Sequence, residues 1–130
     1  MILKTIKSIV FFTLILSFVS CSEYQKMLNN PDTNLKYKAA EVYYKEGEYK
    51  KANRIFEQIV PTYRGKPQAQ RIIYFYANSY FQIRDYNLSA YQFESFVKSY
   101  PKSDRAQEAY FRAAKSYYML APRFSLDQQD

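Results

Sequence analysis

The chain has 130 residues, enough for a single domain, and its formal net charge is +7. With 2 Gly and 5 Pro, the composition argues against a turn-rich β fold and favours helices. Lys and Arg are spread along the chain with no run of four, so we expect solvated helix faces and no nucleic-acid partner. The chain has no His, which removes the commonest general base and the commonest metal ligand. Its one Cys cannot form an intramolecular disulfide. We therefore expect a protein that is not an enzyme and holds no cofactor or metal.

The amino terminus has the layout of a secretory signal peptide. Lys4 and Lys7 precede an apolar stretch over residues 9–19, and the small residue Ser20 precedes Cys21. The apolar stretch is shorter than the roughly 20 residues that a membrane-spanning helix needs. The pattern predicts a lipoprotein signal peptide over residues 1–20 and a lipidated tether over residues 21–32.

The segment Phe18–Cys21 resembles a lipobox, the site at which lipoprotein signal peptidase cuts before a modified Cys. Phe18 stands where Leu is usual. The resemblance implies lipidation at Cys21, with a diacylglyceryl group and usually an N-acyl chain such as palmitate, which together anchor a protein stably. Ser22 after the Cys favours the outer membrane by analogy with enteric bacteria. The alternative is a plain signal peptide in which Cys21 is incidental.

The first predicted unit covers residues 33–66 and contains two helices. Pro31 stops any preceding helix, and Asp32 or Thr33 can cap the next one. Gly47 can adopt the left-handed conformation that ends a helix. The apolar residues of the second helix then fall on one face, at Ala52, Phe56, Ile59 and Val60.

The second predicted unit covers residues 67–103 and repeats this pattern, with a turn at Arg84–Tyr86 and a closing Pro101. A partial third unit covers residues 104–121, with Ser103 or Asp104 as its cap. Residues 122–130 are expected to begin an extended turn and an incomplete helix.

Matching residues recur every 37 positions along these units. The small residues are Ala40, Ala77 and Ala114, and the bulky residues one turn later are Tyr43, Tyr80 and Tyr117, which we expect in the core. The period predicts an all-α solenoid of helical hairpins, with about two and a half repeats of 37 residues. Apolar residues wrap most of the way round the last helix, so we expect marginal stability or self-association and a chain that is part of a longer design.

The segment Tyr43–Ala52 and Pro101 resemble the tetratricopeptide repeat (TPR), although Lys36, Ile73 and Tyr110 stand where that family usually has Trp. The segments Phe96–Pro101, Ala113–Tyr118 and Pro122–Asp130 are similar to the BamD family of outer-membrane assembly lipoproteins. This resemblance implies a lipid-anchored scaffold at the periplasmic face of the outer membrane. It also implies partners: a BamA-like barrel protein, other assembly subunits and unfolded outer-membrane proteins. By this resemblance, we expect the carboxy-terminal repeats that contact BamA in the family to lie outside residues 1–130.

Residues on the inner face of the first helices are the candidates for a peptide-binding groove. Aromatic side chains pack on extended peptides, and an amide such as that of Asn78 can hydrogen-bond their backbone. Each candidate also fits an ordinary solvated or inter-repeat position. The candidates are Tyr37, Glu41, Tyr44, Tyr74, Asn78, Phe81, Arg112 and Lys115.

Two other functions fit the same pattern. A TPR lipoprotein of another cell-envelope system, such as Tol-Pal or peptidoglycan, is one, although the lipobox counts against most of those proteins. A glycan-binding nutrient-uptake lipoprotein is the other. The lack of Trp counts weakly against it, because glycan platforms favour such rings.

Overall fold

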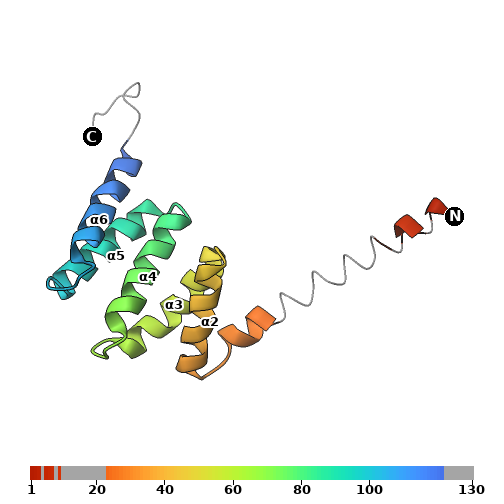
Figure 1. Ribbon diagram of the computed structural model, residues 1–130, viewed down its shortest axis with the longest axis horizontal. Helices are drawn as coiled ribbons and strands as arrows, with labels where there is room; N and C mark the ends of the chain where they lie inside the picture. The colour runs from red at the N-terminus through yellow and green to blue at the C-terminus, as the bar shows by residue number, and fades with distance from the viewer. Residues whose placement is uncertain (4, 8, 10–22, 122–130) are drawn as a thin grey trace.

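The computed structural model describes residues 1–3, 5–7, 9 and 23–121. Within residues 23–121 the main elements are α2 (Thr33–Lys45), α3 (Tyr49–Tyr63), α4 (Ala69–Gln82), α5 (Tyr86–Ser99) and α6 (Ala106–Leu120) (Figure 1). The described residues contain no strand. The predicted all-α solenoid of TPR-type hairpins is thus confirmed.

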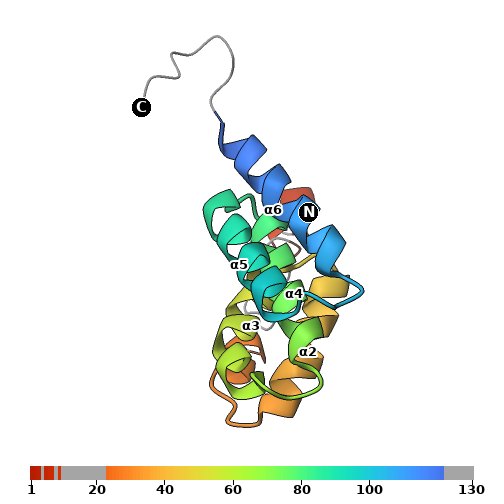
Figure 2. The same cartoon turned by 90° about the vertical axis from the view of Figure 1, so that its left-hand side faces the viewer.

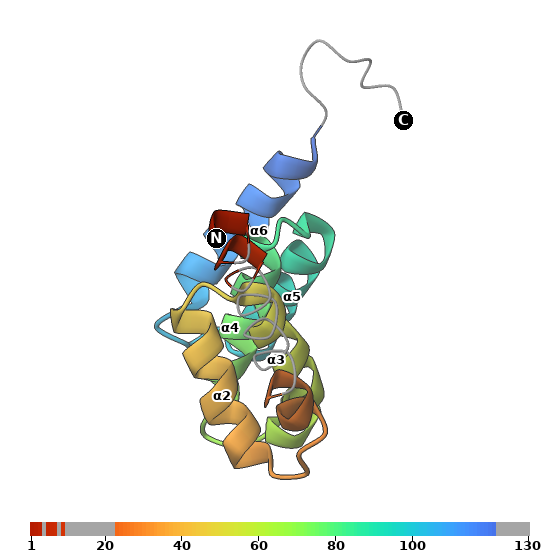
Figure 3. The ribbon, with the colours of Figure 1, turned by 90° about the vertical axis from the view of Figure 1, so that its right-hand side faces the viewer.

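The helices form two layers. Each helix packs mainly on the next one in the sequence, from α2 through to α6. Figures 2 and 3 show α2, α4 and α6 in one layer, with α3 and α5 in the other. The first helix of every unit therefore lies on the same side of the solenoid, which is the arrangement that the groove prediction requires.

Left-handed residues end the first helix of each complete unit. Gly47 has φ 79° and follows α2, while Arg84, 37 positions later, has φ 65° and follows α4. The predicted cap of α2 is confirmed, since the Asp32 carboxylate accepts the backbone N–H groups of Asn34 at 2.8 Å and Leu35 at 3.2 Å. The turn geometry thus repeats even where Arg replaces Gly.

The prediction that Ser103 or Asp104 caps the third unit is wrong. α6 begins at Ala106, and the preceding Arg105 provides no side-chain cap. The Ser103 hydroxyl accepts from the Arg105 N–H at 3.3 Å, and the Ser103 carbonyl accepts from the Ala106 N–H at 2.9 Å. The turn between α5 and α6 therefore uses Ser103 for its own closure.

Two apolar clusters form the core. The first joins α2, α3 and α4 around Phe56 and Ile59, and the second joins α4, α5 and α6 around Phe93 and Phe96. Ala40 and Ala77 are completely buried, in keeping with close helix approach at the small positions. The third member of that series, Ala114, is exposed.

The three periodic tyrosines differ in the same way. Tyr80 is buried and Tyr43 is half-buried, whereas Tyr117 is 51% exposed. The expectation that all three belong to the core is therefore wrong for Tyr117, because no helix in the described part of the chain covers that side of α6.

A short helical segment precedes α2, at residues 23–28 within the expected tether. The Tyr24 ring meets the Tyr43 ring edge-on with centroids 5.6 Å apart, and its hydroxyl donates to the Lys51 carbonyl at 3.4 Å. Figure 3 shows this segment lying beside α3. Tyr24 thus ties the end of the expected tether to the first hairpin.

Candidate functional site

The eight groove candidates lie on α2, α4 and α6, the three helices of one layer. Several occupy equivalent positions in successive units: Tyr37 corresponds to Tyr74, and Glu41 corresponds to Asn78 and Lys115. Because equivalent positions on stacked helices face the same way, these side chains form one row across the layer. We call this row the inner face.

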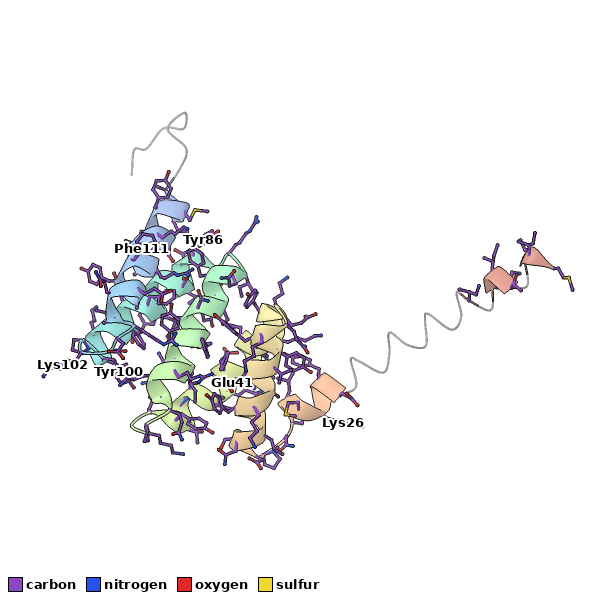
Figure 4. The ribbon with its side chains drawn as sticks, viewed as in Figure 1. Lys26, Glu41, Tyr86, Tyr100, Lys102 and Phe111 are labelled. Atoms are coloured by element: carbon purple, nitrogen blue, oxygen red, sulfur yellow. The ribbon has the colours of Figure 1, made fainter. Side chains whose placement is uncertain are left out.

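At the junction of α2 and α4 the inner face carries a linked set of polar and aromatic contacts. The Tyr37 hydroxyl donates to the Glu41 carboxylate at 2.8 Å, and the Arg71 guanidinium forms an ion pair with the same carboxylate at 2.8 Å. Burial, followed by the bond to Glu41, raises the pKa of Tyr37 to about 12. Figure 4 shows Glu41 between α2 and α4. Glu41 therefore joins the first two units.

Tyr44 and Asn78 form a second link across that junction. The Asn78 amide donates to the Tyr44 hydroxyl, and the Tyr44 ring stacks against Phe75 with centroids 4.7 Å apart. Burial raises the pKa of Tyr44. Among the described residues, the Asn78 side-chain carbonyl oxygen is buried and has no hydrogen-bond partner. The side-chain N–H group of Asn78 is thus hydrogen-bonded, whereas its side-chain oxygen is not.

At the junction of α4 and α6 the inner face carries contacts between cations and rings. The Arg105 guanidinium lies 4.7 Å from the Tyr74 ring centre, and Arg112 lies 5.3 Å from that of Phe81. Lys115 lies 5.7 Å from the same Phe81 ring. Such contacts hold a cation against a ring face by electrostatic attraction. Cation–ring contacts therefore join α6 and the turn before it to α4 along the inner face, above the apolar cluster that these helices share.

Glu108 supplies the carboxylate of this junction. It forms an ion pair with Arg112 at 3.4 Å and accepts a hydrogen bond from the Tyr74 hydroxyl. The bond from Tyr74, helped by Arg112 and Arg105, lowers the pKa of Glu108. Burial and the bond to Glu108 raise the pKa of Tyr74. Tyr74 and Glu108 thus couple α4 to α6.

The candidates differ in accessibility. Tyr74 is 4% exposed and Asn78 is 7% exposed, so they form the floor of the inner face. Tyr37, Glu41, Tyr44, Phe81 and Arg112 are half-buried, and Lys115 is exposed. A ligand on this face would therefore meet chiefly the half-buried and exposed side chains.

Sequence reasoning missed four residues that the structure adds to this face, namely Arg71, Phe75, Arg105 and Glu108. Phe75 stands 37 positions before Arg112, so the period could have identified it. Arg71 lies one helical turn before Phe75, and its guanidinium lies 5.3 Å from that ring centre. The 37-residue period and helical spacing from the candidate residues were thus the available signals.

Two hollows adjoin this layer. One, of about 620 Å³, lies between the loops that precede α4 and α6 and is lined by Arg71, Tyr100, Lys102 and Arg105 among others. The other, of about 280 Å³, lies between α5 and α6 and is lined by Val97, Tyr110, Ala113 and Tyr117 among others. The first hollow is mainly basic and opens beside the inner face.

Within the described ranges, no group of three or more Cys, Asp or Glu side chains is placed to hold a metal ion. No helix there is both long and apolar enough to cross a membrane. The predicted lipidation site Cys21, like residues 122–130, lies outside the described residues.

Comparison with known proteins gives one clear relationship. No curated protein matches the chain. A family model described as YfiO, outer membrane lipoprotein, matches residues 29–130, which covers α2 to α6. The match includes the whole inner face, from Tyr37 to Lys115. The chain therefore belongs to the YfiO family of outer membrane lipoproteins.

Proposed function

We propose that this chain is a lipid-anchored scaffold of outer-membrane β-barrel protein assembly, at the periplasmic face of the outer membrane. The observation that carries the proposal is the family match over residues 29–130. In this role the chain binds and positions polypeptides and catalyses no reaction. Its partners are a BamA-like barrel protein, other assembly subunits and unfolded outer-membrane proteins.

The inner face is the proposed polypeptide-binding groove. Its support is the continuity of the contacts from Tyr37 and Glu41 on α2, through Phe75 and Phe81 on α4, to Lys115 on α6. Rings and charged groups alternate along this row, so an extended chain would find both apolar and polar partners. The nearly buried Tyr74 and Asn78 would hold these groups in position from beneath.

The proposal assigns a role to each segment of the chain. Residues 1–20 are the signal peptide, and residues 21–32 are the tether that carries the lipid on Cys21. Residues 33–66, 67–103 and 104–121 are the repeat units, the last one partial. Residues 122–130 begin the next turn and helix. The packing of Tyr24 on Tyr43 and Lys51 supports a short link between the lipid and the first unit.

Lipidation is tested by comparing the natural chain with Cys21→Ala in cells fed labelled palmitate. We expect label on the natural chain and none on the variant, with the natural chain in the outer-membrane fraction. Ser20→Ala, which keeps a small residue before the Cys, is the matched control and should stay labelled. Equal labelling of natural chain and Cys21→Ala would overturn the lipid-anchor assignment.

The binding role is tested with a photo-crosslinking residue placed on the inner face. At Lys115, which is exposed there, we expect crosslinks in intact cells to a BamA-like protein or to unfolded barrel proteins. Tyr91, exposed on α5 in the other layer, is the control position and should give few of them. Recovery of Tol-Pal or peptidoglycan proteins, or of glycan transporters, would instead identify one of the alternative envelope systems.

A further inference from the structure

The cations of the inner face are held in two pairs, each pair sharing one aromatic ring of α4. Arg71 and Arg105 lie 5.3 and 5.6 Å from the centre of the Phe75 ring. Arg112 and Lys115 lie 5.3 and 5.7 Å from the centre of the Phe81 ring. The rings therefore carry cations on their faces, so a ligand on this surface meets positive charge as well as apolar area.

The charge on this surface is unbalanced. Glu41 pairs with Arg71 at 2.8 Å, and Glu108 pairs with Arg112 at 3.4 Å. Among the described residues, neither Arg105 nor Lys115 forms an ion pair. Each ring thus gathers one neutralised cation and one cation that is left for a ligand.

The positions of Phe75 and Phe81 on α4 also determine how far apart the two cation pairs lie. Phe75 and Phe81 are six residues apart on α4, which corresponds to about 9 Å along the helix axis and about 120° around it. In an extended chain, side chains two residues apart lie on the same side at about 7 Å from each other. The two cation pairs are thus separated both along and around α4, so one carboxylate cannot serve both, whereas one extended segment can present a separate carboxylate to each pair.

The hollow beside Arg71 and Arg105 gives room at one end of this row. It has a volume of about 620 Å³, and Lys102 adds a third cation to its lining, against the one carboxylate of Asp104. Figure 4 shows Tyr100 and Lys102 in the loop region after α5, at the end of the layer where this hollow lies. An acidic side chain can enter here while the peptide backbone continues along α4 and α6.

We propose that the inner face binds extended polypeptide segments that carry at least two acidic residues on one side, with one carboxylate at each cation pair. The inference rests on the proposed function and names its substrate class. Arg105 and Lys115 make the first contacts. Arg71 and Arg112 are shared between the ligand and their resident partners, Glu41 and Glu108.

The test uses the full mature chain, lipidated and held in detergent, with short fluorescein-labelled peptides. One peptide carries two Asp-Ser-Asp motifs, and its matched control carries Asn in place of every Asp. By fluorescence anisotropy we expect the acidic peptide to bind about tenfold more tightly at low salt. The difference should shrink as ionic strength rises, because salt screens exposed charges.

Variants of the chain locate the binding. Arg105→Gln with Lys115→Gln should weaken binding of the acidic peptide about tenfold and leave the Asn peptide unaffected. Lys115→Gln alone, at an exposed side chain, should weaken it about threefold and guards against a folding defect of the double variant. The control is Lys50→Gln with Lys98→Gln, which removes two exposed cations from α3 and α5 and should change nothing.

Glu41→Gln tests the same idea in the opposite direction. The amide still accepts from Tyr37 but no longer neutralises Arg71, so affinity for the acidic peptide should rise several-fold. A residue with a merely structural role would lower affinity or leave it unchanged. Unaltered or weaker binding in this variant would contradict the inference.

Other outcomes separate this inference from the proposed function. Equal affinity for the acidic and the Asn peptides, unaffected by the variants, overturns the acidic preference and leaves the groove intact. Displacement of the acidic peptide by glycerol phosphate at equal charge concentration overturns it in favour of phosphate headgroups. Absence of binding to either peptide also overturns it, while the crosslinking from Lys115 in cells still judges the proposed function by itself.

Discussion

The helices α4 and α6 carry the same repeat positions, but these positions are buried in α4 and exposed in α6. Tyr80 of α4 is 8% exposed and Tyr117 of α6 is 51% exposed, although they stand 37 residues apart in one series. Ala77 is fully buried, whereas Ala114 is exposed. α4 lies between α3 and α5, whereas α6 packs mainly on α5 alone. Burial in this protein therefore depends on the neighbouring helix and not on the residue type.

The largest loss of stability should come from removing the α5 side chain that covers α4, which is Phe93. Phe93 is completely buried and packs with Tyr74 and Ala77 in the second cluster. Phe93→Ala should lower the free energy of unfolding by about 3–5 kcal/mol, because it leaves a cavity. Denaturant unfolding followed by circular dichroism measures the loss. Tyr91→Ala, exposed on the same helix, should cost less than about 0.5 kcal/mol.

A matched pair of substitutions tests the comparison most directly. Ala77→Leu should destabilise the protein by about 1–3 kcal/mol, because the extra side chain has no space beside Phe93 and Phe96. Ala114→Leu should change the free energy of unfolding by less than about 0.5 kcal/mol, because it faces the open hollow between α5 and α6. Similar losses in both variants, from the same unfolding measurement, would show that α6 is covered in solution.

The comparison extends to the helix starts, since α2 is capped by a side chain and α6 is not. Asp32→Ala removes the acceptor of two backbone N–H groups and should cost about 1 kcal/mol of unfolding free energy. Asp104→Ala is the control and should be almost neutral, because Asp104 caps nothing in α6. Thermal unfolding of the two variants gives the difference, and an equal loss would contradict the assigned caps.

The smallest effect concerns the polar contact between α4 and α6. The pKa of Glu108 is lowered by the Tyr74 hydroxyl, then by Arg112 and Arg105, so its contribution is complete above the ordinary value of 4.5. The contribution is lost as pH falls through the lowered pKa of the folded state. Because Glu108 is half-exposed, it should amount to a few tenths of a kcal/mol.

Glu108→Gln isolates this contribution. The variant should lose less unfolding free energy than the natural chain between pH 6 and pH 3, as measured by denaturant unfolding. Glu46→Gln, at an exposed residue just after α2, is the control and should retain the natural pH dependence. If the unfolding free energies of the natural chain and of Glu108→Gln depend on pH in the same way, the assigned coupling between Tyr74 and Glu108 is contradicted.

The sequence predicts much of the fold and part of the candidate site. The recurrence of Ala40, Ala77 and Ala114 follows the packing needs of helical hairpins, so it predicted the solenoid and the layer that holds the groove candidates. The cap at Asp32 and the left-handed Gly47 were predictable because they depend on a few neighbouring residues. The start of α6 was not predictable, because the Ser103 hydroxyl and carbonyl can each accept from several neighbouring N–H groups, and they accept from Arg105 and Ala106.

The sequence by itself determined the helices, their period and the side of each helix that faces its neighbours, because local spacing controls these properties. Only the tertiary structure decided which of those faces is covered. It also brought Arg105, from the turn before α6, to the Phe75 ring of α4, a contact that no spacing along the chain reveals. Contacts between units depend on how far and at what angle helices approach, and that geometry exists only in the packed solenoid.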